Sequence, residues 1–246
     1  MDRLIYTAMT GAKHAFLQQA GVSHNLANAS TIGFRSMEHK FRAAPVQGEG
    51  LPTRAFVVDA SVADTFDQGP MMATGRPLDV AIRGEGWIAV EAPNGQEAYT
   101  RAGNLQTNSN GQLQTANGFN VLSDGGPIAL PPDATISISP DGTISSVPLF
   151  GSPNTVNIVG RIKLVNPPET DLVRGDDGLF RIRDGQPAET DETVRLASET
   201  LEGSNVNPVD AMVNLISLAR QFEMQIKMLQ MAEGNASKAD QILAVG

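Results

Sequence analysis

The three histidines of this chain are the first candidates for chemistry, because imidazole is a common proton carrier and metal ligand. They are His14, His24 and His39, all within the first 40 residues. Their spacings do not match two metal ligands one helical turn apart, and they suggest no serine–histidine–aspartate triad. The chain has no cysteine, which excludes disulfides and thiolate chemistry. We therefore predict surface or interface histidines, with no metal site and no catalytic site.

Two glycine-containing segments could hold a ligand, but their context argues against it. Gly84-Glu85-Gly86 is followed by the strand-like run Trp87-Ile88-Ala89-Val90, whereas a phosphate-binding loop leads into a helix. Asp176-Asp177-Gly178 lacks the remaining ligands of a calcium-binding EF-hand loop. The 27 acidic residues could include a glycosidase pair, but no two of them stand out. We predict no cofactor.

Charge and hydropathy exclude further classes of protein. The net charge is −9, and no segment supplies the dense basic face of a nucleic-acid binder. No stretch approaches the roughly 20 apolar residues of a transmembrane helix, so no membrane span is predicted. Polar residues interrupt the N-terminal segment, which therefore does not resemble a cleaved signal peptide. These features indicate either a cytoplasmic protein or export without a cleaved signal.

Apolar spacing predicts a helix at each end of the chain. Over residues 2–28, apolar side chains alternate at four and three residues, at Ile5, Met9, Ala12, Phe16 and Leu26. Over residues 208–244, one series recurs every seven residues and a second lies three residues before it. The first series includes Leu215, Phe222 and Leu229, and the second is Met212, Ala219 and Ile226. These narrow seams are typical of coiled coils.

The sequence indicates where the second helix begins but leaves open what packs against it. Pro208 suits a first helical turn, and Asn207 or Asn205 is a plausible N-cap. The seams could belong to an ordinary core helix or to an interface helix. The two terminal helices could pair with each other or with other copies, and pairing that does not close would give a filament.

Between the helices the sequence is typical of antiparallel β structure. Seven Asn-Gly or Asp-Gly dipeptides lie in this part, and such pairs favour hairpin turns. They separate short β-branched runs at residues 80–82, 87–90, 135–138, 155–159 and 161–165. Residues 29–78 give few signals and are interpreted as extended linker and short strands. The predicted fold class is α+β, with a mainly antiparallel β body between coiled-coil-like terminal helices.

Several motifs resemble those of the flagellar rod and hook axial proteins. The N-terminal part has Asn25-Leu26-Ala27-Asn28, then Ser30-Thr31-x-Gly33-Phe34-Arg35. The middle has Arg76-Pro77-Leu78-Asp79-Val80-Ala81-Ile82, Gly84-x-Gly86-Trp87 and Tyr99-Thr100-Arg101-x-Gly103. The C-terminal part has Leu201-Glu202-x-Ser204-Asn205-Val206-Asn207, then Arg220-Gln221-Phe222-Glu223 and Lys227. The resemblance spans the chain, and its opening residues suit a proximal-rod member. Ser23-His24 before Asn25 departs from many relatives.

The resemblance implies a non-enzymatic structural subunit of the bacterial flagellar basal body, in the rod that crosses the periplasm. It implies self-assembly with copies of itself and with other proximal and distal rod proteins, and export by the flagellar type III apparatus. Residues 1–45 and 199–246 would form a helical axial domain, 46–80 a connector and 81–198 an outer β domain. Assembly would use the two seams and a motif made of Asn25, Leu26, Ala27, Asn28, Thr31, Gly33, Phe34, Ser204, Asn205 and Val206.

Part of that motif has a simpler interpretation. Asn25 and Asn28 could merely cap the first helix, Gly33 could supply a positive φ, and Phe34 could anchor the next strand. Three other functions remain as alternatives: a distal-rod or hook protein, a secreted carbohydrate-binding or hydrolytic β protein, and an adhesin head on a coiled coil. A carboxylate pair in a cleft would favour the hydrolase, and a closed trimer in solution would favour the adhesin.

Overall fold

A computed structural model describes residues 2–45, 55–149 and 156–244 of the chain. The chain divides into two compact units, each built from segments that are distant in sequence. The helical unit comprises Met1–Ala29, Ser36–Thr65 and Val206–Gly246. The β unit comprises Ser30–Arg35 and Phe66–Asn205. The α+β fold class predicted from the sequence is confirmed.

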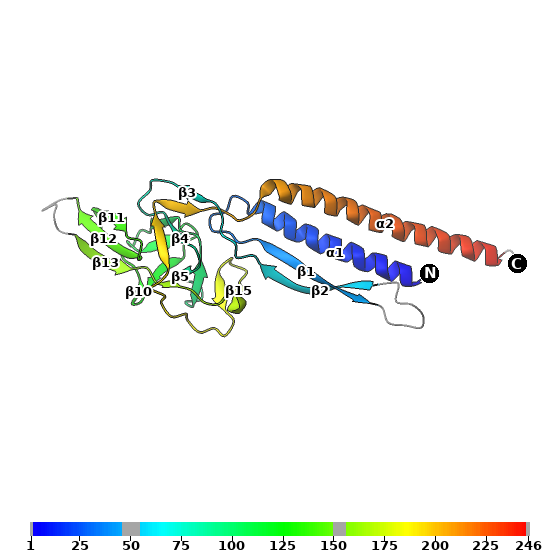
Figure 1. Ribbon diagram of the computed structural model, residues 1–246, viewed down its shortest axis with the longest axis horizontal. Coiled ribbons are helices and arrows are strands. Elements are labelled where there is room, and N and C mark those ends of the chain that lie inside the picture. Colours follow the sequence, from blue (N-terminus) through cyan, green and yellow to red (C-terminus); the bar gives the residue numbers. More distant parts are fainter. Residues whose placement is uncertain (1, 46–54, 150–155, 245–246) are drawn as a thin grey trace. The chain divides into compact units, whose positions relative to one another are not determined.

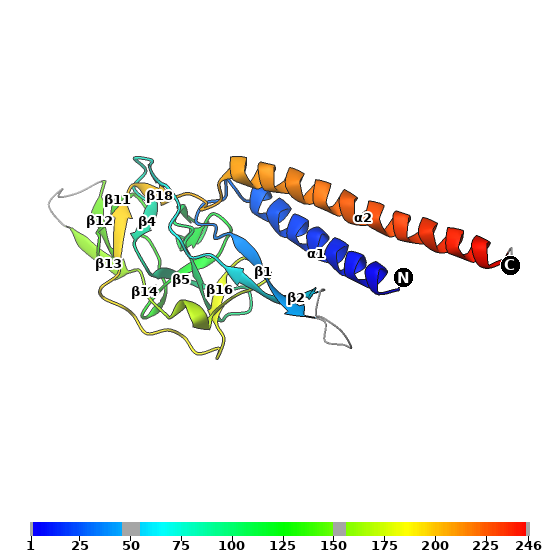
Figure 2. The ribbon, with the colours of Figure 1, turned by 45° about the vertical axis from the view of Figure 1, so that its right-hand side comes forward.

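Two long helices run antiparallel in the helical unit. They are α1 (Asp2–Ala27) and α2 (Pro208–Ala244), which lie side by side in Figures 1 and 2. The terminal helices therefore pair with each other within one chain, which the sequence left open. The side chain of Asn207 accepts a hydrogen bond from the amide of Val209 at 3.0 Å, so Asn207 is the N-cap of α2. Neither helix is long and apolar enough to cross a membrane, as far as the described residues show.

A long hairpin lies along α1 where the sequence predicted only linker and short strands. Strands β1 (Met37–Pro45) and β2 (Ala55–Asp64) pair antiparallel over their whole length, and both contact α1. In Figure 1, α1 runs between this hairpin and α2. The hairpin lacks an Asn-Gly or Asp-Gly turn signal, and it is held by tertiary contacts instead. One of them joins the rings of His14 and Phe41, whose centroids are 5.1 Å apart.

The β unit is made of short antiparallel strands. One sheet has the order β15-β16-β6-β5-β9-β8-β7, with β10 beside β9 and β14 beside β5; a second has the order β11-β12-β13, and β17 pairs with β4 and β18 with β3. The strands are β3 (Met71–Ala73), β4 (Val80–Arg83), β5 (Trp87–Glu91), β6 (Glu97–Thr100), β7 (Leu105–Thr107), β8 (Leu113–Thr115), β9 (Asn120–Ser123), β10 (Gly126–Pro127), β11 (Ala134–Ile138), β12 (Thr143–Pro148), β13 (Asn157–Arg161), β14 (Leu164–Val165), β15 (Leu172–Arg174), β16 (Phe180–Ile182), β17 (Arg195–Ser198) and β18 (Thr200–Glu202). A single 3₁₀ turn, η1 (Glu169–Asp171), precedes β15.

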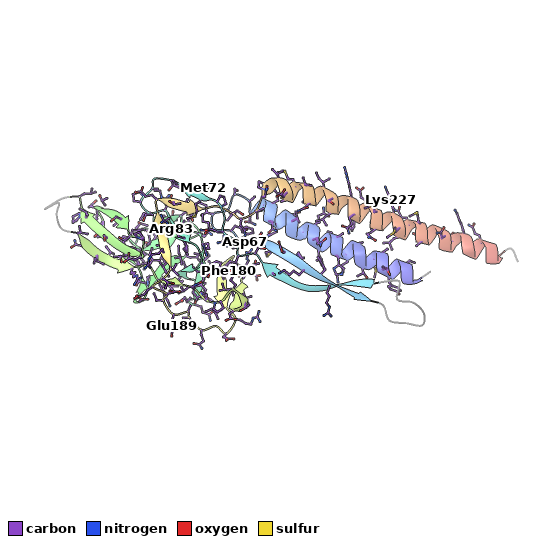
Figure 3. The ribbon with its side chains drawn as sticks, in the orientation of Figure 1. Asp67, Met72, Arg83, Phe180, Glu189 and Lys227 are labelled. Carbon is purple, nitrogen blue, oxygen red and sulfur yellow. The ribbon has the colours of Figure 1, made fainter. Side chains whose placement is uncertain are left out.

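One apolar core joins most of these small sheets. It contains Val80 of β4, Ile88 of β5, Leu113 of β8, Ile144 of β12 and Leu196 of β17, each at most 1 % exposed. Because strands of different sheets share this core, the β body is one unit and not two. A smaller cluster packs Phe66 and Trp87 against Phe180, which Figure 3 labels.

The turn prediction holds closely, and one strand prediction does not. The glycine has a positive φ in six of the seven Asn-Gly or Asp-Gly pairs. The run 161–165 is not one strand, because β13 ends at Arg161 and β14 begins at Leu164. Between them, the amide of Ile162 donates to Gly142 and that of Lys163 donates to Leu122, so the chain changes partner there.

The compact units differ in their boundaries from the predicted domains. Residues 55–64 of the expected connector form β2 of the helical unit, and residues 66–80 belong to the β unit. Residues 199–205, assigned from the sequence to the helical domain, belong to the β unit because β18 pairs with β3. The part of the connector at residues 46–54 lies outside the described residues.

Candidate assembly surface

The first half of the sequence motif fixes the end of α1. The side-chain amide of Asn25 donates to the carbonyl of Met37 at 2.8 Å, and the amide of Met37 donates back to Asn25 Oδ1 at 2.9 Å. The side chain of Asn28 donates to the carbonyl of His24 at 3.0 Å, which caps the last turn. Both asparagines were candidates for helix capping. Asn28 caps α1, whereas Asn25 attaches the start of β1 to the helix.

The second half of the motif lies in the β unit. Gly33 has a φ of 68°, as the simpler interpretation required, and its amide donates to the carbonyl of Glu202 at 2.8 Å. A Cβ atom here would lie 2.4 Å from the carbonyl carbon of Arg101, so only glycine fits. The carbonyl of Phe34 accepts from the amide of Asn205 at 3.3 Å, and the guanidinium of Arg174 lies 5.1 Å from the Phe34 ring centroid.

A buried ion cluster surrounds this segment. Glu202 is fully buried and lies between two arginines, 2.7 Å from Nη1 of Arg35 and 3.1 Å from Nη1 of Arg101. The amide of Gly69 donates to the same carboxylate at 2.9 Å. Burial lowers the pKa of Arg101 from its ordinary value, and the nearby carboxylate of Glu202 opposes that shift. The sequence did not single out this cluster, although all three ionic residues lie within the motifs quoted above.

The remaining motif residues differ in burial and divide between the two units. Leu26 and Val206 are half-buried in the helical unit, while Ala27 is exposed there. In the β unit, Thr31 is exposed and Ser204 is buried. Backbone hydrogen bonds thus join Gly33 to Glu202 and Asn205 to Phe34, and the other motif residues divide between the two units.

The predicted seams divide between two faces of each helix. Ile5, Leu215, Ala219, Phe222, Ile226 and Leu229 are half-buried. Met9, Phe16 and Met212, in contrast, are 53 %, 60 % and 52 % exposed. Gly11 of α1 faces Gln225 of α2, and three further small residues of α1, Ala8, Ala12 and Ala15, are buried. The large seam residues Met9 and Phe16 of α1 are instead exposed.

Both helices carry further large apolar side chains on the outward side. Tyr6 is 57 % exposed on α1, and on α2 the exposed set comprises Val209, Met212, Val213, Ile216, Met224, Met228 and Met231. Lys227 also stands on the side of α2 away from α1 (Figure 3). An exposed apolar patch of this kind is typical of a protein–protein interface. We call these two faces the outward faces of α1 and α2.

Two of the three histidines lie beside Phe41 of the hairpin. His14 is buried against Phe41, and the ring of His39 stacks on Phe41 with a centroid distance of 6.2 Å. His24 is exposed near the end of α1. His14 and His39 thus belong to the contact between α1 and the hairpin. Across the described ranges, no three histidine or acidic side chains are grouped as metal ligands.

Known flagellar proteins are similar to this chain in the same regions that carry the sequence motifs. Residues 81–146 match the family "Flagellar hook protein FlgE/F/G D1 domain", and residues 197–242 match "Flagellar basal body rod FlgEFG protein C-terminal". The chain is 45 % identical to the flagellar basal-body rod protein FlgF of Escherichia coli K12, with both proteins covered completely. The chain belongs to the FlgF family of flagellar basal-body rod proteins. It is also 45 % identical, again over both full lengths, to FlgF of Salmonella typhimurium LT2.

A more distant rod protein is similar over nearly the same span. FlgG of Agrobacterium fabrum C58 is 30 % identical, with 96 % of this chain and 97 % of that protein covered. The C-terminal family match begins in β17 and runs along most of α2, so it includes Glu202 and the outward face of that helix. The region shared with this family therefore contains part of the buried ion cluster and the outward face of α2.

Proposed function

We propose that the chain is a non-enzymatic structural subunit of the flagellar basal-body rod, in its proximal part, and that it polymerises through its terminal helices. The relationship to FlgF supports the place in the rod. The observation that carries the mechanism is the pair of outward apolar faces on α1 and α2. Copies of this chain and other proximal and distal rod proteins would cover these faces.

The energetics favour association through these faces. Burying one large apolar side chain contributes about 1.5–3 kcal/mol, so several of them can offset the entropy lost on docking. The subunit would reach the rod by flagellar type III export. Once there, it would transmit torque as part of the shaft, and this requires rigid packing and no chemistry.

The proposal is tested by making the outward face of α1 polar. A variant carrying Tyr6→Ser, Met9→Ser and Phe16→Ser is expected to fold normally, because these side chains contribute little to the packing within the chain. It is expected to enter purified basal bodies at least about tenfold less than the unmodified chain, since a few kcal/mol of contact would be lost. Immunoblotting of the isolated basal bodies measures the incorporation.

The matched control removes exposed apolar side chains from the β unit. Val156→Ser, Ile158→Ser and Val173→Ser change residues that are 63 %, 75 % and 44 % exposed. This variant is expected to enter basal bodies normally. Normal incorporation of the α1 variant would contradict assembly through the helices, and absence of the unmodified chain from basal bodies would contradict the place in the rod.

A further inference from the structure

The outward face of α1 has a regular spacing. Seven of its exposed residues follow one another at three and four positions, with His24 exposed beside them; the seven are Tyr6, Met9, Lys13, Phe16, Ala20, Ser23 and Ala27. Side chains at such spacing form one straight stripe along a helix, which is the geometry of lengthwise helix packing. The outward face of α1 therefore suits lengthwise packing against another helix.

The outward face of α2 carries a stripe of the same kind. At spacings of four and three it presents Val209, Val213, Ile216, Arg220, Glu223 and Lys227, all of them exposed. A second spacing series, on the side toward α1, contains the half-buried Leu215, Phe222 and Leu229. Because the two series lie on opposite sides of α2, one side packs within the chain and the other remains for a second helix.

The packing within the chain defines a register between the two helices. A Cβ atom added to Gly11 would lie 3.0 Å from the side chain of Gln225, so these positions face each other. Further along, Gln18 and Val22 of α1 line the same groove as Leu218 and Asn214 of α2. Each step forward on α1 therefore corresponds to one step back on α2, as expected for antiparallel helices.

The same register, applied to the two outward stripes, brings complementary side chains to the same level. The pairs of residues at the same height along the helix axes are Lys13 and Glu223, Phe16 and Arg220, Ala20 and Ile216, and Ser23 and Val213. In a second copy at the same height, the single acid of the α2 stripe would therefore stand level with the single base of the α1 stripe. There a guanidinium would stand level with an aromatic ring, and two small residues level with two β-branched ones, as in the packing of knobs into holes.

We infer that the α1 stripe of one copy packs antiparallel along the α2 stripe of a second copy at the same height, with Lys13 paired to Glu223. This inference rests on the proposed assembly of the chain into the rod. Within one copy the two stripes lie on opposite sides of the helix pair, so they cannot meet each other. A contact between two different faces leaves one of each face free, and this adds further copies around or along an axis.

The absence of cysteine allows a direct test in the assembled rod. Two forms of the full chain, one with Ala20→Cys and the other with Ile216→Cys, are produced in the same cells, and basal bodies are purified under oxidising conditions. A disulfide-linked pair containing both forms is expected, because the two positions are level in the inferred contact. As a control, Ala20→Cys is combined with Gln230→Cys, which is exposed four helical turns away on α2 and should give no linked pair.

A second experiment tests the ion pair. Lys13→Met or Glu223→Met alone leaves one charge buried without its partner, and each is expected to lower incorporation into basal bodies about tenfold. The double variant removes both charges and is expected to recover incorporation to within about twofold of the unmodified chain. Circular dichroism of the purified variants checks that the helices are intact.

The outcomes separate this inference from the proposal on which it rests. If the Ala20–Ile216 link is absent, or if the double methionine variant assembles no better than the single ones, the inferred contact is wrong. In that case the α1 serine variant described above still decides whether the helices drive assembly at all. If both results are as expected, the register between neighbouring copies is established.

Discussion

Replacing Glu202 with Gln is expected to lower the free energy of unfolding of the β unit by about 3–5 kcal/mol, the cost of breaking a buried ion cluster. The carboxylate is fully buried between Arg35 and Arg101. Glutamine keeps the size of the side chain but removes the negative charge, so two buried guanidinium groups face each other without it. Urea unfolding followed by fluorescence of Trp87 measures the effect, because this is the only tryptophan and lies in the same unit.

The control is Glu199→Gln, three residues away and exposed. It is expected to change the free energy of unfolding by no more than about 0.5 kcal/mol. Equal stability of the Glu202 and Glu199 variants would show that the cluster does not hold residues 30–35 in the β unit. The ion pair of Arg35 with Glu202 would then contribute nothing to the stability of the β unit.

Replacing Leu215, Phe222 and Leu229 together with Ser is expected to separate α1 from α2 in the isolated chain. These residues are half-buried on the side of α2 toward α1, and each loss should cost about 1–2 kcal/mol of packing. Most of the stability of a helix in a protein comes from tertiary packing of its apolar face, so helix content should fall when this packing is lost. Circular dichroism at 222 nm and hydrogen exchange of the α1 amides measure the change.

The matched variant makes the opposite side of the same helix polar, at Val209, Val213 and Ile216. It is expected to keep its helix content and its α1 protection but to lose incorporation into basal bodies. Retained motility and a normal rod with the first triple variant would argue against a role for the helix pair. Equal loss of helix content in both variants would contradict the assignment of separate inner and outward faces to α2.

The sequence alone predicted both terminal helices, because their apolar residues recur over several turns. It did not distinguish the faces of α1, and the reason is the type of residue at each face. Gly11 faces Gln225 of α2, and Ala8, Ala12 and Ala15 are buried; such small residues give a weak apolar signal. Met9 and Phe16 give a stronger signal but face outward. Apolar spacing therefore shows that a helix packs against a partner. It does not show which face of the helix contacts which partner.

Two other features depend on long-range contacts that no local pattern contains. The β1–β2 hairpin lacks the usual turn dipeptides and is fixed to α1 by Asn25. Glu202 belongs to a residue type that is almost always exposed, and only the approach of two arginines from distant segments makes its burial tolerable. The hairpin turns of the β unit were predictable, because Asn-Gly and Asp-Gly act locally.

The helical unit explains how one chain can be folded and still be ready to assemble. The faces of α1 and α2 that point toward each other are packed within the chain, and the β1–β2 hairpin covers another side of α1. The outward faces remain exposed in the single chain, and docking onto other axial subunits would cover them. Folding and polymerisation thus use different residues of the same two helices, which is why the two triple variants of α2 should differ.

The most direct test of this account is the reactivity of single cysteines on the outward faces, in the isolated chain and in purified basal bodies. Ala20→Cys and Val213→Cys are expected to react readily with a soluble maleimide when the chain is isolated, since both positions are exposed. In the rod they are expected to be protected, whereas Glu189→Cys in the β unit should remain reactive. Equal reactivity of the two helical cysteines in both states would contradict assembly through the outward faces.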